Sequence, residues 1–95
     1  MKILNELYDV VVERKNSKIE GSYTCYLFDK GLDKILKKCG EESAEVIIAA
    51  KNNDNNELKN EIADLLYHLT VLCAQQGLRW EEIEMVLKER KCLKK

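Results

Sequence analysis

The 95-residue chain has no proline, only four glycines and one histidine, and aromatic residues make up just 6% of it. Proline disrupts helix interiors and is common in the turns of β proteins, so its absence favours an all-α fold. No stretch approaches the roughly 20 apolar residues that a membrane-spanning helix needs. The net charge is −1, whereas nucleic-acid-binding proteins usually carry an excess of Lys and Arg. These absences predict a helical protein that binds neither membranes nor nucleic acids.

The cysteines, Cys25, Cys39, Cys73 and Cys92, are widely separated and form no C-x-x-C pair, which makes a zinc site unfavourable. The N-terminal sequence becomes acidic at Glu6, before an apolar signal-peptide core could form. We therefore expect a cytoplasmic protein with reduced cysteines. The length fits one compact domain, residues 1–95, because two domains would each be too small to bury a core.

Apolar residues recur at helical spacing along nearly the whole chain. The predicted helices are residues 3–14, a short segment that Ser22 caps and Gly31 closes, a long segment ending at the Asn-rich run 52–56, a segment from Asp54 to Gly77, and a last segment carrying Ile83, Val86 and Leu87. Asp54 stands three residues before Glu57, which is the spacing of a capping box.

The two longest predicted helices each carry a continuous apolar face, which we expect to form the core. The two faces are Leu32, Ile35, Leu36, Cys39, Ser43, Val46, Ile47 and Ala50, and Leu58, Ile62, Leu65, Leu66, Leu69, Leu72 and Cys73. A few amphipathic helices of this length cannot easily cover their own apolar faces. The sequence therefore predicts an all-α bundle of four to five helices, completed by a second copy of the chain.

Acidic residues gather on the same two helices. On the first, Lys34, Lys38, Glu41 and Glu45 lie opposite the apolar face, with Glu42 at its margin; on the second, Glu57, Glu61, Asp64 and His68 follow one another at i, i+4, i+7 and i+11. Like charges at this spacing destabilise a helix by about 0.2–0.5 kcal/mol per pair, and a bound cation would remove the repulsion. Hard divalent ions such as Mg²⁺ favour carboxylate oxygens and are commonly shared with substrate phosphates.

A purely structural explanation also exists for these charges. Glu41 can pair with Lys37, and Glu42 with Lys38, on a solvated helix face. A lone histidine such as His68 is more often a hydrogen-bonded structural residue than a ligand. Spacing alone leaves the metal site and the solvated face as alternatives.

The segment Glu41-Glu42-Ser43-Ala44-Glu45, followed by Glu61-Ile62-Ala63-Asp64, resembles the E-E-x-x-E…E-x-x-D signature of the all-α nucleoside triphosphate pyrophosphohydrolases, the MazG-like superfamily. More specific segments resemble the phosphoribosyl-ATP pyrophosphohydrolase family of histidine biosynthesis. They are Ser22-Tyr23-Thr24, Gly31, Lys34-Ile35, Lys38-Cys39-Gly40-Glu41-Glu42 and Asp64-Leu65-Leu66-Tyr67-His68-Leu69. The resemblance extends from about Leu7 to Arg90. Two positions depart from the family: Ser43 replaces an alanine, and Arg79 stands where a Ser, Thr or Asp usually caps the last helix.

The resemblance implies hydrolysis of 1-(5-phosphoribosyl)-ATP to 1-(5-phosphoribosyl)-AMP and pyrophosphate by an all-α homodimer. It implies dependence on Mg²⁺, with Mn²⁺ as an alternative ion, and we expect the cyclohydrolase that acts next to be another chain. The implied metal ligands are Glu42, Glu45, Glu61 and Asp64, and the implied catalytic carboxylates are Glu41, Glu42 and Glu45, with Glu41 orienting water. The implied substrate-binding residues are Arg14, Ser22, Tyr23, Thr24, Lys34, Lys38 and His68.

Two other functions remain open at this point. One is a housekeeping pyrophosphatase of the same superfamily acting on dUTP, dCTP or a damaged nucleotide. The other is a non-catalytic helical dimerisation module whose acidic stripe binds a structural cation or a basic partner. A panel of triphosphates with pyrophosphate detection distinguishes the three hypotheses.

Overall fold

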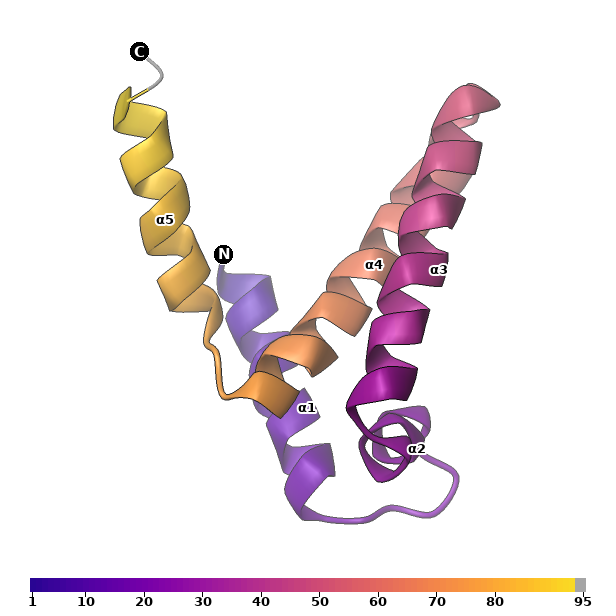
Figure 1. The fold of residues 1–95 in the computed structure, drawn as a ribbon, viewed down its shortest axis with the longest axis vertical. Helices are drawn as coiled ribbons and strands as arrows, with labels where there is room; N and C mark the ends of the chain where they lie inside the picture. Colours follow the sequence, from indigo (N-terminus) through magenta and orange to yellow (C-terminus); the bar gives the residue numbers. More distant parts are fainter. Residues whose placement is uncertain (94–95) are drawn as a thin grey trace.

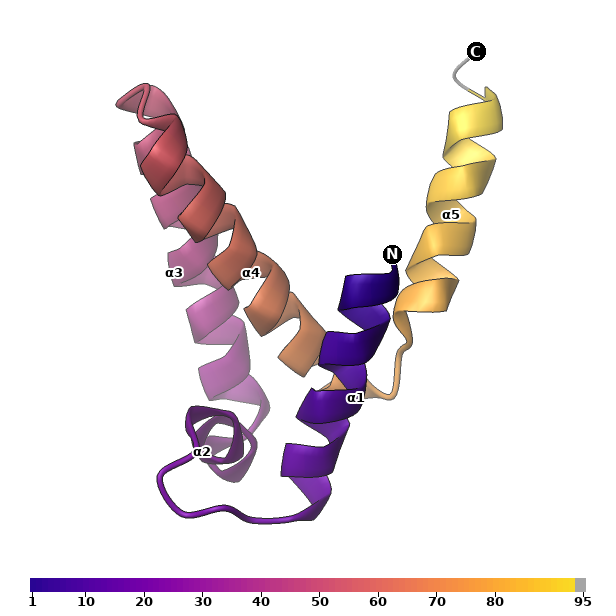
Figure 2. The ribbon, with the colours of Figure 1, turned by 180° about the vertical axis from the view of Figure 1, so that it is seen from behind.

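The computed structural model describes residues 1–93, which form five helices and no strand. The helices are α1 (Lys2–Asn16), α2 (Tyr23–Lys30), α3 (Leu32–Lys51), α4 (Asn55–Gln76) and α5 (Trp80–Leu93). Figure 1 shows them arranged as a V, with α3 and α4 side by side in one arm and α5 in the other. From behind, α1 crosses near the C-terminal half of α4, and α2 lies at the lower end of α3 (Figure 2). The all-α fold predicted from the sequence is confirmed.

The expected helix ends are confirmed by their capping contacts. The Ser22 side chain accepts a hydrogen bond from the Cys25 amide at 3.2 Å, and the Asp54 side chain accepts one from the Glu57 amide at 3.1 Å. Gly77 ends α4 with a φ of 71°, a left-handed conformation that glycine adopts without strain. Local sequence therefore determines where these helices begin and end.

Arg79 precedes α5, and its side chain has no oxygen that could accept a hydrogen bond from the first amides of the helix. Its backbone amide instead donates a hydrogen bond to Oε2 of Glu82 at 2.9 Å. This contact is the glutamate half of a capping box, and it satisfies one of the amides that a helix start leaves unpaired. The departure from the family at position 79 is thus partly compensated.

The core lies where α1, α2, α3 and α4 meet. Its fully buried apolar side chains are Val11, Leu27, Ile35 and Val71. Trp80, at the start of α5, is also buried, and its indole Nε1 donates a hydrogen bond to Thr70 Oγ1 at 3.1 Å. This buried bond attaches the first turn of α5 to α4.

The predicted core face of α3 is only partly correct. Ile35 is buried and Val46 is half-buried, but Leu36 and Ile47 are 46% and 63% exposed, while Glu42 is only 7% exposed. Leu32, Ser43 and Ala50 are also exposed, and Ala49 is buried instead. The residues that α3 turns toward α4 are spaced seven apart, at positions 35, 42 and 49, and they do not coincide with its most apolar stripe. Pairing with α4 orients the helix, so Glu42 lies inside rather than at the margin.

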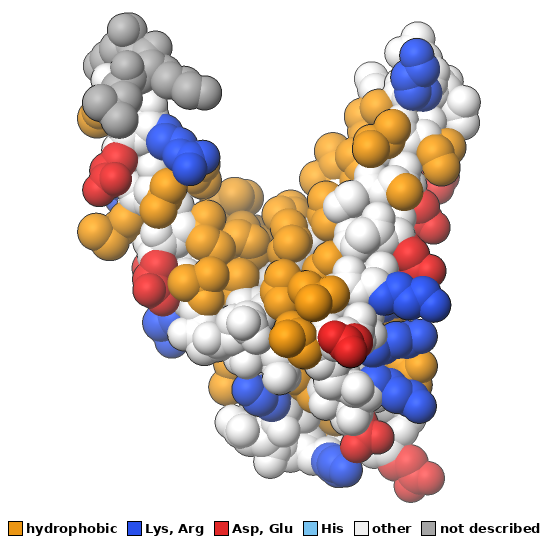
Figure 3. All heavy atoms as spheres, in the orientation of Figure 1, with side chains coloured by type: hydrophobic (Ala, Val, Ile, Leu, Met, Phe, Trp, Pro, Cys, Tyr) orange, Lys and Arg blue, Asp and Glu red, His pale blue; other side chains and the backbone are white. Residues whose placement is uncertain are grey.

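The apolar residues left over face the inside of the V. A groove of about 550 Å³ is lined by Leu32, Leu36, Leu69, Leu72, Cys73, Gln76, Leu78, Trp80 and Ile83. Figure 3 shows hydrophobic side chains gathered on both walls of the notch between the two arms. On α4, Leu58, Leu65, Leu66, Leu69 and Leu72 are half-buried and Ile62 is exposed. The predicted leucine-rich core is therefore incomplete within one chain.

Among residues 1–93, no helix has the length and hydropathy needed to cross a bilayer. The four cysteines all carry free thiols.

Candidate metal and substrate site

The candidate site lies between α3 and α4. Only the turn at residues 52–54 joins these helices, so they run antiparallel and in contact (Figure 1). Glu42 and Glu45 occupy successive turns on the side of α3 that approaches α4, and Glu61 stands opposite them. The E-E-x-x-E and E-x-x-D segments therefore face each other, as the sequence predicts.

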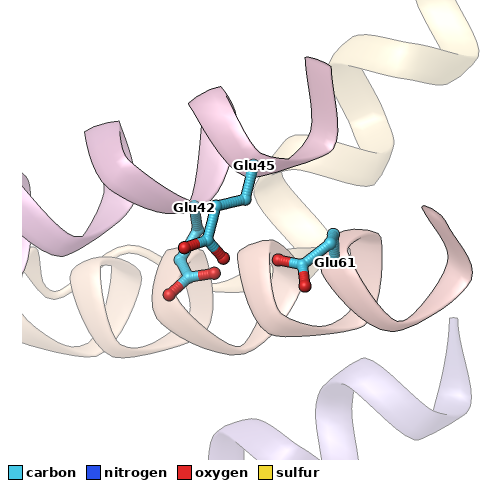
Figure 4. Close-up of side chains that lie close together, drawn as sticks. All are labelled: Glu42, Glu45 and Glu61. Atoms are coloured by element: carbon cyan, nitrogen blue, oxygen red, sulfur yellow. The ribbon is translucent and has the colours of Figure 1, made fainter. Parts of the chain in front are cut away.

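Three carboxylates converge in this space. One oxygen from each of Glu42, Glu45 and Glu61 lies within 4.8 Å of the other two. Figure 4 shows the side chains of Glu42 and Glu45 extending from α3 toward that of Glu61 on α4. This spacing allows three oxygens to coordinate one cation, since Mg²⁺–oxygen distances are about 2.1 Å.

The burial of these oxygens indicates that a cation fits among them. Oε2 of Glu42 and Oε2 of Glu61 are both buried, and within the described residues neither has a hydrogen-bond partner. A buried, unpaired carboxylate oxygen costs free energy unless it gains a proton or a cation. Carboxylate oxygens without donors are also the ligand type that Mg²⁺ and Mn²⁺ accept.

In the absence of a cation, neighbouring carboxylates raise the pKa values of Glu42 and Glu61. The protonated form of Glu61 can donate a hydrogen bond to Glu45, and this contact, together with burial and a similar contact with Glu57, raises the pKa of Glu61 to about 7. Burial and the adjacent charge of Glu45 also raise the pKa of Glu42, against the lowering effect of His68 and Lys38. Near neutral pH the cluster therefore holds a proton that a divalent cation can displace.

Two of the predicted acidic residues lie outside this group of three. Glu41 is exposed, and its Oε1 lies 3.6 Å from Lys38 Nζ, which is also 3.8 Å from Glu42 Oε1. Glu41 therefore pairs with Lys38 and not with Lys37. Asp64 lies one turn beyond Glu61 and is exposed, although its negative charge contributes to the raised pKa of Glu61.

A pocket of about 360 Å³ opens beside the cluster. Its lining residues are Glu45, Ile48, Ala49, Asn52, Glu57 and Glu61. The predicted site did not include Asn52 and Glu57. The i, i+4 spacing of Glu57 and Glu61 was the available signal for Glu57, whereas Asn52 belongs to a turn-forming run that carries no functional signal.

On the other side of the cluster, α2 is joined to α4 by two side-chain hydrogen bonds. Tyr23 Oη lies 2.9 Å from His68 Nε2, and Thr24 Oγ1 is hydrogen-bonded to Tyr67 Oη. His68 is buried, and its other ring nitrogen, Nδ1, lies 2.8 Å from the Asp64 carbonyl oxygen. Two of the segments that make the family resemblance specific, Ser22-Tyr23-Thr24 and the one containing Tyr67 and His68, thus contact each other.

The remaining predicted substrate-binding residues are spread more widely. The hydroxyl of Ser22 is occupied as the cap of α2. Lys34 Nζ lies 5.9 Å from the centre of the Tyr26 ring, a cation–π contact one turn before Lys38. Arg14 is at the end of α1, where it lines a separate pocket with Lys15, Lys18, Cys25, Phe28, Asp29 and Gln75.

Comparison with known proteins agrees with this geometry. The model of the family described as "Phosphoribosyl-ATP pyrophosphohydrolase" matches residues 4–91. The phosphoribosyl-ATP pyrophosphatases of Streptococcus gordonii and Streptococcus sanguinis are 58% and 59% identical, over 93% of this chain and 85% of theirs. The bifunctional histidine biosynthesis protein HisIE of Thermoanaerobacter pseudethanolicus is 62% identical over 86% of this chain and 38% of its own length. The chain therefore belongs to the phosphoribosyl-ATP pyrophosphohydrolase family.

Proposed function

We propose that this chain is the phosphoribosyl-ATP pyrophosphatase of histidine biosynthesis. It hydrolyses 1-(5-phosphoribosyl)-ATP to 1-(5-phosphoribosyl)-AMP and pyrophosphate. The observation that carries this conclusion is the convergence of Glu42, Glu45 and Glu61, with two buried unpaired oxygens, in a chain of this family. In the reaction, a water oxygen attacks phosphorus, the anhydride bond between the α and β phosphates breaks, and pyrophosphate leaves.

Glu42, Glu45 and Glu61 are the residues that hold a divalent cation in this proposal, with Asp64 completing the set when substrate is present. We propose Mg²⁺, with Mn²⁺ as an alternative; the ion would neutralise the triphosphate and acidify the attacking water. Glu41 lies beside the cluster and has an exposed carboxylate, which suits it to orient that water. Glu41 also forms an ion pair with Lys38, whose Nζ lies 3.6 Å from Oε1 of Glu41.

Lys34 and Lys38 follow one another at i, i+4 on α3 and lead toward the acidic cluster. We assign them to the phosphate oxygens of the substrate, as compact positive charges. Arg14 lies further away on α1, where it would contact a distal phosphate. Tyr23, Thr24 and Ser22 at the start of α2 form the side of the site nearest to these lysines, and they complete the proposed substrate contacts.

The test is a substrate panel with pyrophosphate detection in the presence of Mg²⁺. Phosphoribosyl-ATP should be hydrolysed far faster than ATP, dUTP or dCTP. Glu45→Gln should lose this activity, whereas the matched control Glu89→Gln, an exposed carboxylate on α5, should retain it. Preference for dUTP or dCTP would identify the housekeeping pyrophosphatase, and no pyrophosphate from any triphosphate would identify the non-catalytic module.

We also propose that the enzyme is a homodimer. The groove inside the V and a second apolar pocket of about 220 Å³ beside α1 and α5 leave large hydrophobic side chains uncovered. A second copy would cover them with an equally apolar surface, as in symmetric dimers. Since the proposed substrate is a metabolite of amino-acid biosynthesis, we place the enzyme in the cytoplasm, as a single domain.

A further inference from the structure

Tyr23 and His68 form a hydrogen-bonded pair beside the acidic cluster. Tyr23 Oη lies 2.9 Å from His68 Nε2, and the two rings pack edge to face with centroids 5.7 Å apart. Tyr67 also packs edge to face against the imidazole, with centroids 5.0 Å apart, and its ring stacks on that of Tyr23 with centroids 6.2 Å apart. His68 is only 5% exposed, so the ring is held in one orientation and its edge is closed to substrate.

The backbone determines which nitrogen of His68 carries the proton. Nδ1 lies 2.8 Å from the carbonyl oxygen of Asp64, and a carbonyl oxygen can only accept a hydrogen bond. Nδ1 must therefore be protonated. In the neutral ring Nε2 is then an acceptor, so the Tyr23 hydroxyl must be the donor in the second bond.

This direction has a consequence for recognition by Tyr23. Its single proton is engaged by His68, and its oxygen retains only lone pairs with which to meet another group. Phosphate oxygens, ionised at neutral pH, have no proton to donate to it. A sugar hydroxyl has one, and Tyr23 is 44% exposed beside Lys38 and Glu42, so it can be reached from the site.

We propose that His68 is a positioning residue that acts through Tyr23. By holding the Tyr23 proton, it presents the Tyr23 oxygen as a hydrogen-bond acceptor for a sugar hydroxyl of the substrate. The second half of this statement depends on the proposed function, whereas the first half concerns the free protein. His68 thereby supports specificity for a ribosylated triphosphate without touching it.

The first experiment determines which ring nitrogen of His68 carries the proton. The chain has one histidine, so untagged ¹⁵N-labelled protein shows one imidazole in a long-range ¹H–¹⁵N correlation spectrum. At pH 8 we expect Nδ1 at a protonated, pyrrole-type shift and Nε2 at an unprotonated, pyridine-type shift. The reverse assignment, or two averaged shifts, would overturn the proposal whatever the enzyme's activity.

The second experiment measures kinetics with phosphoribosyl-ATP. Tyr23→Phe should raise KM about threefold to tenfold, the effect of one neutral hydrogen bond, with kcat nearly unchanged. His68→Phe should raise KM similarly, and His68→Gln, which keeps an acceptor for Tyr23, should recover part of the loss. In the Tyr23→Phe background, His68→Phe should add little, because its effect passes through the missing hydroxyl.

Substrate analogues that lack each sugar hydroxyl in turn complete the test. For one of them, the KM difference between wild type and Tyr23→Phe should disappear. Additive effects in the double variant, or a difference that persists with every analogue, would contradict the proposal. If wild type releases no pyrophosphate from phosphoribosyl-ATP, the proposed function fails instead, and the spectrum still decides the hydrogen-bond direction.

Discussion

Glu42 and Ile47 lie five residues apart on α3. The charged side chain is buried and the apolar one is exposed, which is the reverse of the usual distribution. Glu42 is 7% exposed and faces α4, whereas Ile47 is 63% exposed and lies on the stripe that leads into the notch of the V. They are separated by roughly 140° around the helix axis. Stability of a single chain would favour the opposite arrangement.

The buried carboxylate of Glu42 and the exposed side chain of Ile47 are compensated in different ways. A cation can compensate the buried carboxylate of Glu42, because Glu45 and Glu61 supply further oxygens beside it. The exposed Ile47 can be compensated only by another apolar surface, because no small ion or solvent molecule covers a hydrocarbon side chain favourably. One face of α3 thus holds the carboxylates of the candidate site, and the other holds the apolar surface at which we propose that a second copy binds.

The largest expected effect is the loss of activity when one of the converging carboxylates is replaced. Glu42→Gln keeps the shape of the side chain but removes its charge, so kcat for pyrophosphate release should fall at least about a hundredfold. Circular dichroism should show unchanged helix content. Turnover within a few-fold of wild type would mean that Glu42 is buried for structural reasons alone.

The second prediction concerns the apolar face of α3, where the substitution Leu36→Lys should prevent the proposed dimerisation. An ammonium group placed in the groove would have to be desolvated on dimerisation, which should weaken association by several kcal/mol, or about a hundredfold or more in Kd. Sedimentation velocity over a range of concentrations should show monomer where wild type is dimer. Asn16→Lys adds the same charge at an exposed position and serves as the control. A wild-type protein that remains monomeric at all concentrations would contradict the proposed dimer.

Mg²⁺ should stabilise the folded protein, and more so at pH 8 than at pH 6. Glu61, whose pKa is about 7 in the metal-free cluster, must lose its proton before it can bind the ion, and at pH 8 it has already done so. At an ion concentration a hundredfold above Kd, binding contributes about 2.7 kcal/mol, or on the order of 10 °C in Tm. Differential scanning fluorimetry with and without Mg²⁺ measures both shifts. Equal shifts in wild type and Glu42→Gln would place the ion elsewhere.

The smallest expected effect concerns the metal-free cluster. Because the pKa of Glu61 is raised from 4.5 to about 7 on folding, the folded state binds more protons than the unfolded state between these values, and stability falls as the pH rises through them. Glu61→Gln removes this loss. In the presence of EDTA, the variant should melt slightly above wild type at pH 8 and equally at pH 4. A lower melting temperature at pH 8 would contradict the assignment of the proton to this cluster.

Much of the fold could be predicted from local signals. Ser22, Gly31, Asp54 and Gly77 mark helix ends by capping chemistry that depends on residues within one turn. The facing of the two acidic segments also followed from the sequence, since a short turn between long helices makes them antiparallel neighbours. These features need no knowledge of distant contacts.

The orientation of α3 could not be predicted in the same way. Periodicity identified the stripe through Leu36 and Ile47 as the core face, because an apolar stripe has the same pattern whether it is covered by its own chain or by another. Because periodicity makes that stripe the buried face of the helix, it predicts Glu42 at the margin of the charged face and not inside the protein. The separation of Arg14 from the rest of the predicted site likewise depends on how α1 packs, and local sequence does not encode this.

The sequence by itself determined an all-α chain, the ends of its helices, and the family to which the acidic motifs point. The helical class and the helix ends arise from interactions between residues close in the chain, and the family follows from the motifs themselves. The tertiary structure alone decided which three carboxylates converge, which apolar face stays open, and that Tyr23 meets His68 across 45 positions. Such contacts depend on how the helices rotate and pack against one another, and that is decided by the summed burial of the whole molecule.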